Sequence, residues 1–350
     1  MVKLTKKTTN KSNSKVRVHV VSETAYFGKG QGVHTAFVDC VGLLRRSNKL
    51  DVIENQDGWG DVLHAHTYGP YFFWKGRKYK GRRVFTVHVI PDSVHGSIPA
   101  GRWLMPFVRK YLRLVYNYAN VCVSISPVVT DALRNLKVSS RIVEIVNPIN
   151  TDHFQHSVKL RAEGRQLLGI PKNAFVVLGV GQLEGRKGVE DFIDVALACP
   201  DIYFVWVGGR PLGITTEGRA RINRCIRNAG SRVHFVGLFD LEKMPLAYNV
   251  ADVFLFSSYQ ENCPLAPIEA AACGLPVIYR DLPEYRRLYK NKYLAATNTA
   301  MFIKITQRLH CDSIYYAYAT ALSETLIKQF GRDQILKSLE KLYIELVRRD

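Results

Sequence analysis

Two glutamates spaced eight positions apart are well suited to chemistry. Glu261 and Glu269 stand in the segment ENCPLAPIEAAACGLPVI, which follows the apolar run VFLFSS. A helix that begins near Pro264 places Glu269 about one and a half turns in and leaves Glu261 in the preceding loop. Carboxylates accept hydrogen bonds strongly, so this pair suits the binding of sugar or ribose hydroxyl groups.

The position of these glutamates after a strand-like run strengthens the interpretation. Open parallel sheets bind ligands at the carboxyl ends of their strands, and a helix N-terminus there offers unpaired N–H groups to a diphosphate. The plain alternative is a solvated glutamate at the start of a helix, where a negative charge favours the helix dipole.

Two adjacent cations form a second group. Arg186 and Lys187 lie in GVGQLEGRKGVEDFI, directly after the apolar run FVVLGVG. Cations at such a position stabilise the charge that develops on a departing phosphate group. An exposed turn with no ligand is the alternative.

Taken together, these segments resemble glycosyltransferase family 4, the retaining enzymes of GT-B fold. The match consists of Glu261, seven residues, Glu269 and the GLPV stretch, together with Lys187 in a Lys-Gly turn, and it extends over nearly the whole chain. The resemblance implies that Glu261 contacts the donor hexose and Glu269 the nucleotide ribose. We expect the intervening loop to contribute to donor binding through Asn262, Cys263, Pro264 and Leu265.

One residue departs from the family pattern. Gln182 stands where the family has an arginine, and Arg186 precedes the matching Lys187. We expect both Arg186 and Lys187 to reach phosphate oxygens. The resemblance further implies a nucleotide-sugar substrate, expected to be a UDP-hexose, and neither a cofactor nor a bound metal.

The N-terminal half offers glycines and histidines. FGKGQGVHTAF resembles the family's glycine loop, in which Gly30 and Gly32 let the backbone approach donor and acceptor, although a tight turn needs the same glycines. His88 ends the run VFTVHV and matches the family histidine beside the sugar, with a satisfied core histidine as the alternative. His66 ends DVLHAH, a frequent family segment, and we favour a structural role for it.

Alternating strand and helix patterns must position these residues. β-branched runs begin at Val16, Asp61, Arg83, Val121 and Ile142, and a second series begins at Phe175, Tyr203, Val233, Val253 and Pro276. This rhythm predicts an α/β protein with two tandem Rossmann-like, doubly wound domains that face a central cleft.

The expected domain limits follow from composition. Residues 1–15 form a basic polar tail that we expect to be disordered, because it has little apolar surface to bury. Residues 16–155 form an acceptor and membrane domain, and residues 156–329 form a nucleotide-sugar domain. Residues 330–350 form an amphipathic helix expected to pack back toward the N-terminal domain.

Charge is concentrated in the first half. Residues 1–150 hold 23 Lys and Arg against nine Asp and Glu, within a net charge of +19 for the chain. No apolar stretch approaches the roughly 18 residues that a spanning helix needs. The seven cysteines are scattered without a zinc-like spacing, which favours a reducing cytoplasm.

An aromatic and basic segment suggests contact with a membrane. RWLMPFVRKYLRLVYNY predicts a helix with Trp103 on an apolar surface and a stripe of Arg109, Lys110 and Arg113. YFFWKGRKYKGRR, just before it, interleaves aromatics with six cations. The alternative for the Trp103 segment is an ordinary buried helix whose cationic stripe is its only solvent-exposed edge. The alternative for the preceding basic run is a solvated loop.

The pattern is most similar to family members that add a second hexose to monoglycosyl diacylglycerol. We therefore expect a retaining transfer of glucose or galactose to a membrane glycolipid, by a protein peripheral to the inner face of the cell membrane. Within the family, polysaccharide assembly is the alternative. From other classes, the basic charge leaves nucleic-acid binding open but not favoured, and GKGQGV followed by Asp51 weakly suggests a nicotinamide-dependent oxidoreductase.

Overall fold

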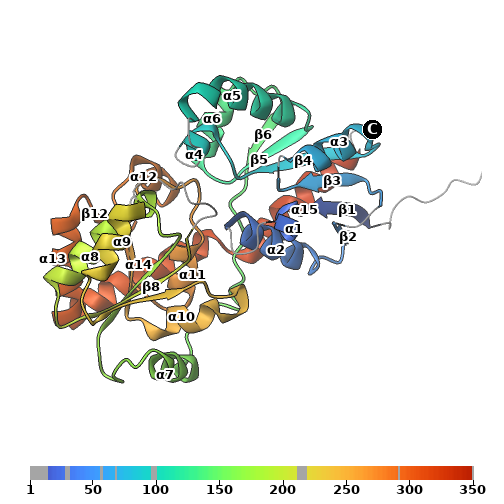
Figure 1. Cartoon of the computed structure of the whole chain (residues 1–350). Coiled ribbons are helices and arrows are strands. Elements are labelled where there is room, and N and C mark those ends of the chain that lie inside the picture. Colours follow the sequence, from blue (N-terminus) through green and yellow to red (C-terminus); the bar gives the residue numbers. More distant parts are fainter. Residues whose placement is uncertain are drawn as a thin grey trace, which may run out of the picture.

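Two six-stranded parallel sheets organise the chain (Figure 1). The computed structural model describes residues 15–27, 32–55, 58–67, 69–95, 101–210, 219–290 and 292–348. The strand order is β2-β1-β3-β4-β5-β6 in the first sheet and β12-β11-β10-β7-β8-β9 in the second. Both orders are those of doubly wound units, so the predicted pair of tandem Rossmann-like domains is confirmed.

Ten of these twelve strands coincide with the β-branched runs of the sequence. They are β1 (Val16–Val21), β3 (Val62–Ala65), β4 (Arg82–Val87), β5 (Val121–Ser124), β6 (Arg141–Glu144), β7 (Val176–Val180), β8 (Tyr203–Val207), β9 (Val233–Gly237), β10 (Val253–Phe256) and β11 (Val277–Arg280). Two strands, β2 (Leu50–Glu54) and β12 (Leu294–Ala296), were not predicted from the sequence. Both are edge strands; β2 mixes acidic with apolar residues, and β12 is only three residues long, so neither has the longer apolar run that marks a strand buried on both faces.

Helices cover both faces of the first sheet. On one face lie α3 (Pro70–Lys78), α5 (Gly101–Asn117) and α6 (Pro127–Asn135), which share a core that includes Phe73, Leu112 and Leu133. On the other face lie α2 (Gly32–Leu44) and α15 (Arg332–Arg348). Two short helices, α1 (Thr24–Phe27) and α4 (Pro91–His95), stand in the loops after β1 and β4.

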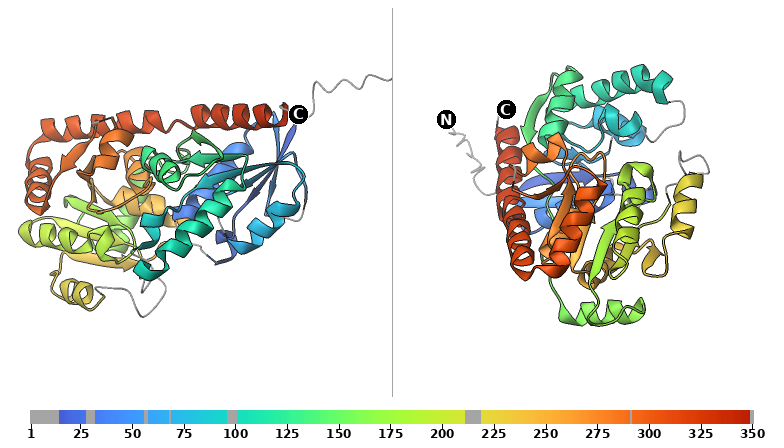
Figure 2. Two further views of the ribbon diagram at one scale, coloured as in Figure 1. Left: turned by 90° about the horizontal axis from the view of Figure 1, so that it is seen from above. Right: turned by 90° about the vertical axis from the view of Figure 1, so that its left-hand side faces the viewer.

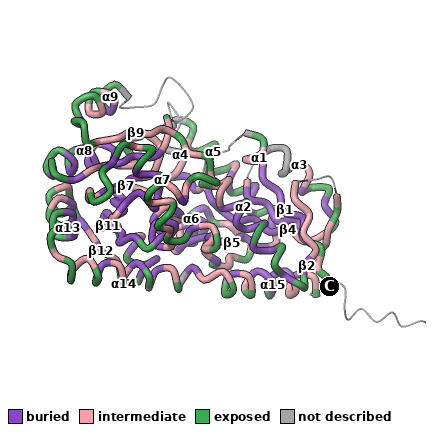
Figure 3. The backbone as a smooth tube through the Cα atoms, turned by 90° about the horizontal axis from the view of Figure 1, so that it is seen from below, coloured by how far each residue is buried: buried purple, intermediate pink, exposed green. Residues whose placement is uncertain are grey.

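The second sheet has the same two-sided cover. One core lies beneath α8 (Val189–Ala198), α9 (Arg219–Arg227) and α13 (Thr299–Cys311). The opposite core lies beneath α10 (Met244–Val250), α11 (Ala266–Ala272), α12 (Pro283–Leu288) and α14 (Ser313–Gln329), and α7 (Val158–Leu167) packs on α10. Two 3-10 turns, η1 (Gly185–Lys187) and η2 (Leu241–Lys243), precede α8 and α10. In Figure 3 the buried backbone follows the central strands of both sheets.

The C-terminal helices run along both domains (Figure 2). α14 packs on α11 in the second domain, and α15 packs on β1 and α2 in the first. Ile335, Leu339 and Leu342 of α15 are buried there. Glu340 reaches Lys49 with a Nζ to Oε2 distance of 2.7 Å, so the end of the chain is held to the first domain by burial and by charge.

Candidate active site

Glu261 lies among cations and a hydroxyl group. Lys187 Nζ donates a hydrogen bond to Oε1 of Glu261, Nη1 of Arg186 lies 3.6 Å from the same oxygen, and Ser258 Oγ donates to it at 2.8 Å. Burial raises the pKa of Glu261, but Lys187 and Arg186 outweigh that effect and hold the pKa below its ordinary value. Glu261 is therefore a carboxylate with strong acceptor oxygens at neutral pH.

Hydrogen bonds join the loop after β7 to the loop after β10, and they bring the cations and Glu261 together. Ser257 Oγ donates to the carbonyls of Lys187 and Gly188 at 3.1 and 2.9 Å. Gly188 has a φ of +69°, and a Cβ there would lie 2.3 Å from the carbonyl oxygen of Ser257. Only glycine fits this turn, which presents Arg186 and Lys187 to the loop of Glu261.

Glu269 is buried and faces a tyrosine. Tyr248 Oη donates to Oε2 of Glu269 at 2.5 Å, and 5% of Glu269 is exposed. Burial raises the pKa of Glu269 to about 7, since the apolar surroundings disfavour its charge, and Asp39 adds to the effect.

This helix begins two residues later than predicted. α11 begins at Ala266 rather than near Pro264, and Glu269 lies in its first turn. Pro267 gives the reason, because a helix that began at Pro264 would need an N–H from position 267 for its intrahelical hydrogen bonds.

His88 follows β4 and is nearly buried. Its Nε2 lies 3.0 Å from Nδ1 of His66, and burial lowers the pKa of His88 to about 4. His88 is therefore a neutral imidazole at physiological pH.

Asn262 links the two domains beside Glu261. Its Nδ2 donates to the carbonyl of His88 at 2.8 Å and to Oγ of Ser93 at 2.8 Å. Arg287 of α12 forms a second link with Asp131 of α6. The first link brings the loops after β4 and β10 together, so His88 and Glu261 belong to one region.

The remaining predicted donor residues lie at different depths. Cys263 is half-buried and packs against cores of both domains, whereas Pro264 and Leu265 are buried. Gly32 is the first residue of α2, and among the described residues no atom outside its own helix backbone lies within 4 Å of where its Cβ would be. Gly30 lies outside the described residues.

α5 exposes apolar and basic side chains together. Leu104, Phe107 and Leu114 are 45%, 72% and 56% exposed. Arg109, Lys110 and Arg113 are exposed too, and no ion pair involves them within the part of the chain that the structure describes. The buried face is formed by Leu112, Val115 and Tyr116. Apolar residues therefore share the outer surface with the cations, unlike an ordinary helix with one wet edge. Trp103 lies on the same helix, but its side chain is outside the described part.

Two residues that interact with Glu269, Tyr248 and Asp39, were not predicted from the sequence. Tyr248 lies 21 positions before Glu269 on another helix, and burial raises the pKa of Asp39 to about 7. Neither residue stands in a recognisable motif, so no local signal could have identified them.

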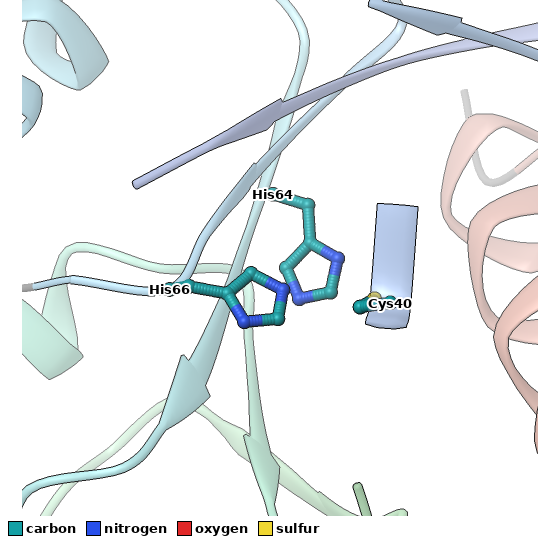
Figure 4. A group of neighbouring side chains, drawn as sticks. All are labelled: Cys40, His64 and His66. Atoms are coloured by element: carbon teal, nitrogen blue, oxygen red, sulfur yellow. The ribbon is translucent and has the colours of Figure 1, made fainter. Parts of the chain in front are cut away.

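One group of potential metal ligands occurs among the described residues (Figure 4). It consists of Cys40, His64 and His66, whose ligand atoms lie within 4.8 Å of one another. Both ring nitrogens of His64 are already hydrogen-bonded, Nδ1 to Tyr343 Oη and Nε2 to Thr86 Oγ1, each at 2.7 Å. A metal ion would therefore have to displace one of these partners.

None of the described helices is both long and apolar enough to cross a membrane.

Comparison with known families gives matches over both domains. Residues 16–153 match Glycosyltransferase Family 4, and residues 161–313 match Glycosyl transferases group 1.

Two curated relatives extend the likeness. The chain is 33% identical over 291 residues to alpha-galactosylglucosyldiacylglycerol synthase of Streptococcus pneumoniae, covering 80% of this chain and 76% of that protein. It is 27% identical to processive diacylglycerol alpha-glucosyltransferase of Acholeplasma laidlawii, covering 82% of this chain and 86% of that protein.

Solved structures share the fold. Anabaena HepE in complex with UDP-glucose superposes with a TM-score of 0.76 at 18% identity, covering 95% of this chain and all of that one. Sucrose-phosphate synthase from Thermosynechococcus elongatus superposes with a TM-score of 0.77 at 19% identity, covering 96% and 100% of the two chains.

Proposed function

The chain belongs to glycosyltransferase family 4 and has the GT-B fold, and we propose that it transfers a hexose from a UDP-sugar to a glycosylated diacylglycerol at an anionic membrane surface. The observation that carries this proposal is one cluster. Glu261 lies against Arg186 and Lys187, while the next residue, Asn262, is hydrogen-bonded to the carbonyl of His88 in the other domain.

The cations and Glu261 would exchange partners when the donor binds. In the structure, Lys187 and Arg186 pair with Glu261. A diphosphate carries more negative charge than one carboxylate and competes for both cations. Glu261 then keeps the bond from Ser258 and can accept hydrogen bonds from hydroxyls of the hexose, while Glu269 accepts them from the ribose.

The reaction proceeds with retention. An acceptor hydroxyl attacks the anomeric carbon on the face that the nucleotide diphosphate leaves, and the proton of the hydroxyl departs with the diphosphate. No nucleophile from the protein is needed. Arg186 and Lys187 stabilise the charge on the leaving phosphate, and His88 orients the sugar.

The outer surface of α5 supports a membrane-bound acceptor. Exposed Phe107 and Leu114 can enter the interface while Arg109 and Arg113 meet acidic headgroups. α3 packs on the same face of the first sheet and adds Trp74, which is 59% exposed with Arg77 over its ring. The proposal locates the enzyme on the inner face of the cell membrane.

The names of the relatives support the acceptor class. The synthase of Streptococcus pneumoniae and the transferase of Acholeplasma laidlawii are both named for diacylglycerol glycolipids. We propose monoglycosyl diacylglycerol as acceptor and glucose or galactose as the transferred sugar.

The first experiment measures incorporation of labelled hexose from UDP-glucose and UDP-galactose. The acceptors are diacylglycerol and monoglucosyl diacylglycerol in vesicles with and without anionic lipid. We expect a labelled diglycosyl lipid that forms only with anionic lipid. UDP release on other acceptors without any glycolipid product would instead indicate polysaccharide assembly.

A second experiment tests the role of Glu261. Glu261→Ala is expected to abolish transfer without weakening UDP binding, because it removes the contacts to the sugar and leaves Arg186 and Lys187 available to the diphosphate. Glu190→Ala is the control, since the ion pair of Glu190 with Arg221 lies outside this cluster. Loss of UDP binding in Glu261→Ala would contradict its assignment to the hexose.

A third experiment tests the membrane surface. Replacing three exposed cations of α5 by glutamine should weaken pelleting with anionic vesicles, since each cation near such a surface contributes about 1 kcal/mol. A control variant removes the same charge from exposed cations of the second domain. The test positions are Arg109, Lys110 and Arg113, and the control positions are Arg224, Arg227 and Lys243. Equal pelleting of both variants would refute the role of α5.

A further inference from the structure

Buried histidines lie stacked at the carboxyl edge of the first sheet. His64 and His66 of the β3 segment are 0% and 3% exposed, and their ring centroids lie 4.7 Å apart. The ring of His66 stacks on that of His88 at 5.2 Å, with 3.0 Å between Nδ1 of His66 and Nε2 of His88. His88, which lies beside the candidate active site, is thus packed against the buried ring of His66.

These histidines are neutral, so each carries one ring proton. Burial lowers the pKa of His88 to about 4 and that of His64 to about 3, and it holds the pKa of His66 well below its ordinary value. A neutral imidazole donates from one nitrogen and accepts at the other. In the bond between His66 and His88, one ring must therefore donate and the other accept.

The other nitrogen of His66 decides which ring donates. Within the described part of the chain, Nε2 of His66 is buried and has no hydrogen-bond partner. If the proton of His66 were on Nε2, a buried N–H would lack an acceptor, an arrangement that folded proteins rarely tolerate. If the proton is on Nδ1, only a lone pair is left unused. His66 is therefore the donor and Nε2 of His88 the acceptor.

We propose that His66 is a positioning residue that holds His88 in the tautomer protonated on Nδ1, so that His88 presents an N–H donor to a hydroxyl of the transferred hexose. The contact with the hexose rests on the function proposed above, whereas the tautomer rests on the histidine pair alone. Nδ1 of His88 has no partner among the described residues, and 9% of this side chain is exposed. A ligand therefore finds this nitrogen unoccupied.

Hydrogen bonding favours this role over metal binding for the same histidines. A metal held by Cys40, His64 and His66 would need a free nitrogen on His64, but Tyr343 and Thr86 occupy both. The thiol would also have to ionise, and burial raises the pKa of Cys40 to about 12.

The tautomer can be read directly by NMR. Full-length protein with ¹⁵N-labelled histidine gives ring-nitrogen shifts that distinguish protonated from unprotonated positions, and the signals of His88 are assigned by their loss in His88→Gln. We expect protonated Nδ1 and unprotonated Nε2 on His88 in the wild-type protein at pH 7. A proton on Nε2 of His88 would overturn the proposal.

Two substitutions at His66 separate the effect of its N–H donor from the effect of its packing against His88. His66→Asn keeps an amide N–H close to the place of Nδ1 and is expected to preserve the His88 tautomer. His66→Leu removes the donor that holds the proton of His88 on Nδ1, so the ring should lose its single tautomer and the Nε2–H form, which a free imidazole prefers, should become populated. Thr86→Val is the control, because it removes a hydrogen bond of His64 and leaves the pair of His66 and His88 untouched.

Hexose transfer supplies an independent measure. We expect His66→Leu to lower kcat by about tenfold, the effect of one lost hydrogen bond, with UDP affinity unchanged. His66→Asn should recover most of the rate. If His66→Leu does not fold by circular dichroism, the wild-type and His66→Asn spectra still test the tautomer.

Three further results discriminate among explanations. An unchanged His88 tautomer in folded His66→Leu would overturn the proposal. So would one zinc ion per chain that is lost in His66→Leu, since His66 would then act as a ligand. Absence of transfer from any UDP-hexose, with the expected tautomer present, would refute the proposed function and leave the tautomer assignment standing.

Discussion

Replacing Glu269 by glutamine is expected to stabilise the free protein at alkaline pH and to weaken its binding of UDP. Glu269 is 5% exposed, and its partner Tyr248 donates a hydrogen bond that a glutamine carbonyl can also accept. Glu269→Gln therefore removes the charge and keeps the contact.

The expected gain in the free energy of unfolding follows from proton binding by Glu269. The pKa of Glu269 is raised from 4.5 to about 7 by burial. Between these values the folded state holds a proton that the unfolded state has released, so unfolding free energy falls as pH rises through this window. Above the window the loss amounts to about 3 kcal/mol. Glu269→Gln lacks this titration and should be more stable than wild type by that amount at pH 8.5, and equally stable near pH 4.5.

Urea denaturation at both pH values measures the difference, and Glu340→Gln provides a control of opposite sign. Glu340 is also buried, but hydrogen bonds from Lys49 and Ser47 outweigh the burial that raises its pKa and hold that pKa below its ordinary value. The stability contributed by Glu340 is present above its ordinary pKa and is lost as pH falls. Glu340→Gln should therefore destabilise the protein at pH 8.5.

Isothermal titration calorimetry measures the affinity of Glu269→Gln for UDP, which is the functional part of this prediction. If Glu269 holds the ribose hydroxyls, the neutral amide should bind UDP about tenfold more weakly, since hydrogen bonds to charged groups are the stronger ones. A Glu269→Gln protein no more stable than wild type at pH 8.5, alongside a destabilised Glu340→Gln, would refute the electrostatic reasoning. Unchanged UDP affinity would refute the role in ribose binding.

Other substitutions test packing and surface. Tyr248→Phe leaves Glu269 without its hydrogen-bond donor and should lower the free energy of unfolding, measured by urea denaturation, by about 1.5–3 kcal/mol. Tyr285→Phe should leave that free energy almost unchanged, because the buried hydroxyl of Tyr285 has no partner among the described residues. Gly188→Ala should lower the free energy of unfolding by more than about 2 kcal/mol because its Cβ meets backbone, whereas Gly42→Ala, in open space within α2, should raise it by about 0.5–1 kcal/mol. Phe107→Ser should weaken vesicle binding even at high salt, since Phe107 is 72% exposed and its contribution is not screened; unchanged flotation would count against insertion of α5.

Much of the fold could be predicted from the sequence because buried parallel strands have a local signature. Runs rich in β-branched residues, such as VRVHVV and FVVLGVG, identify ten strands without any knowledge of their neighbours. The edge strands β2 and β12 lack that signature, and pairing with a neighbour defines them. The start of α11 was misplaced by two residues, because the effect of Pro267 on the first turn was not considered.

The candidate site, like the fold, has features that the sequence determines and features that only the tertiary structure decides. Glu261, Glu269 and Lys187 belong to local motifs, so sequence alone determined which residues to consider. Only the tertiary structure decided their partners, since Tyr248 reaches Glu269 across 21 positions and Asn262 reaches the carbonyl of His88 across 174. Burial, and with it the raised pKa of Glu269 and the neutral state of His88, also depends on the packing of distant segments. A sequence motif specifies which groups are present, whereas their charge and orientation are set by what the fold places around them.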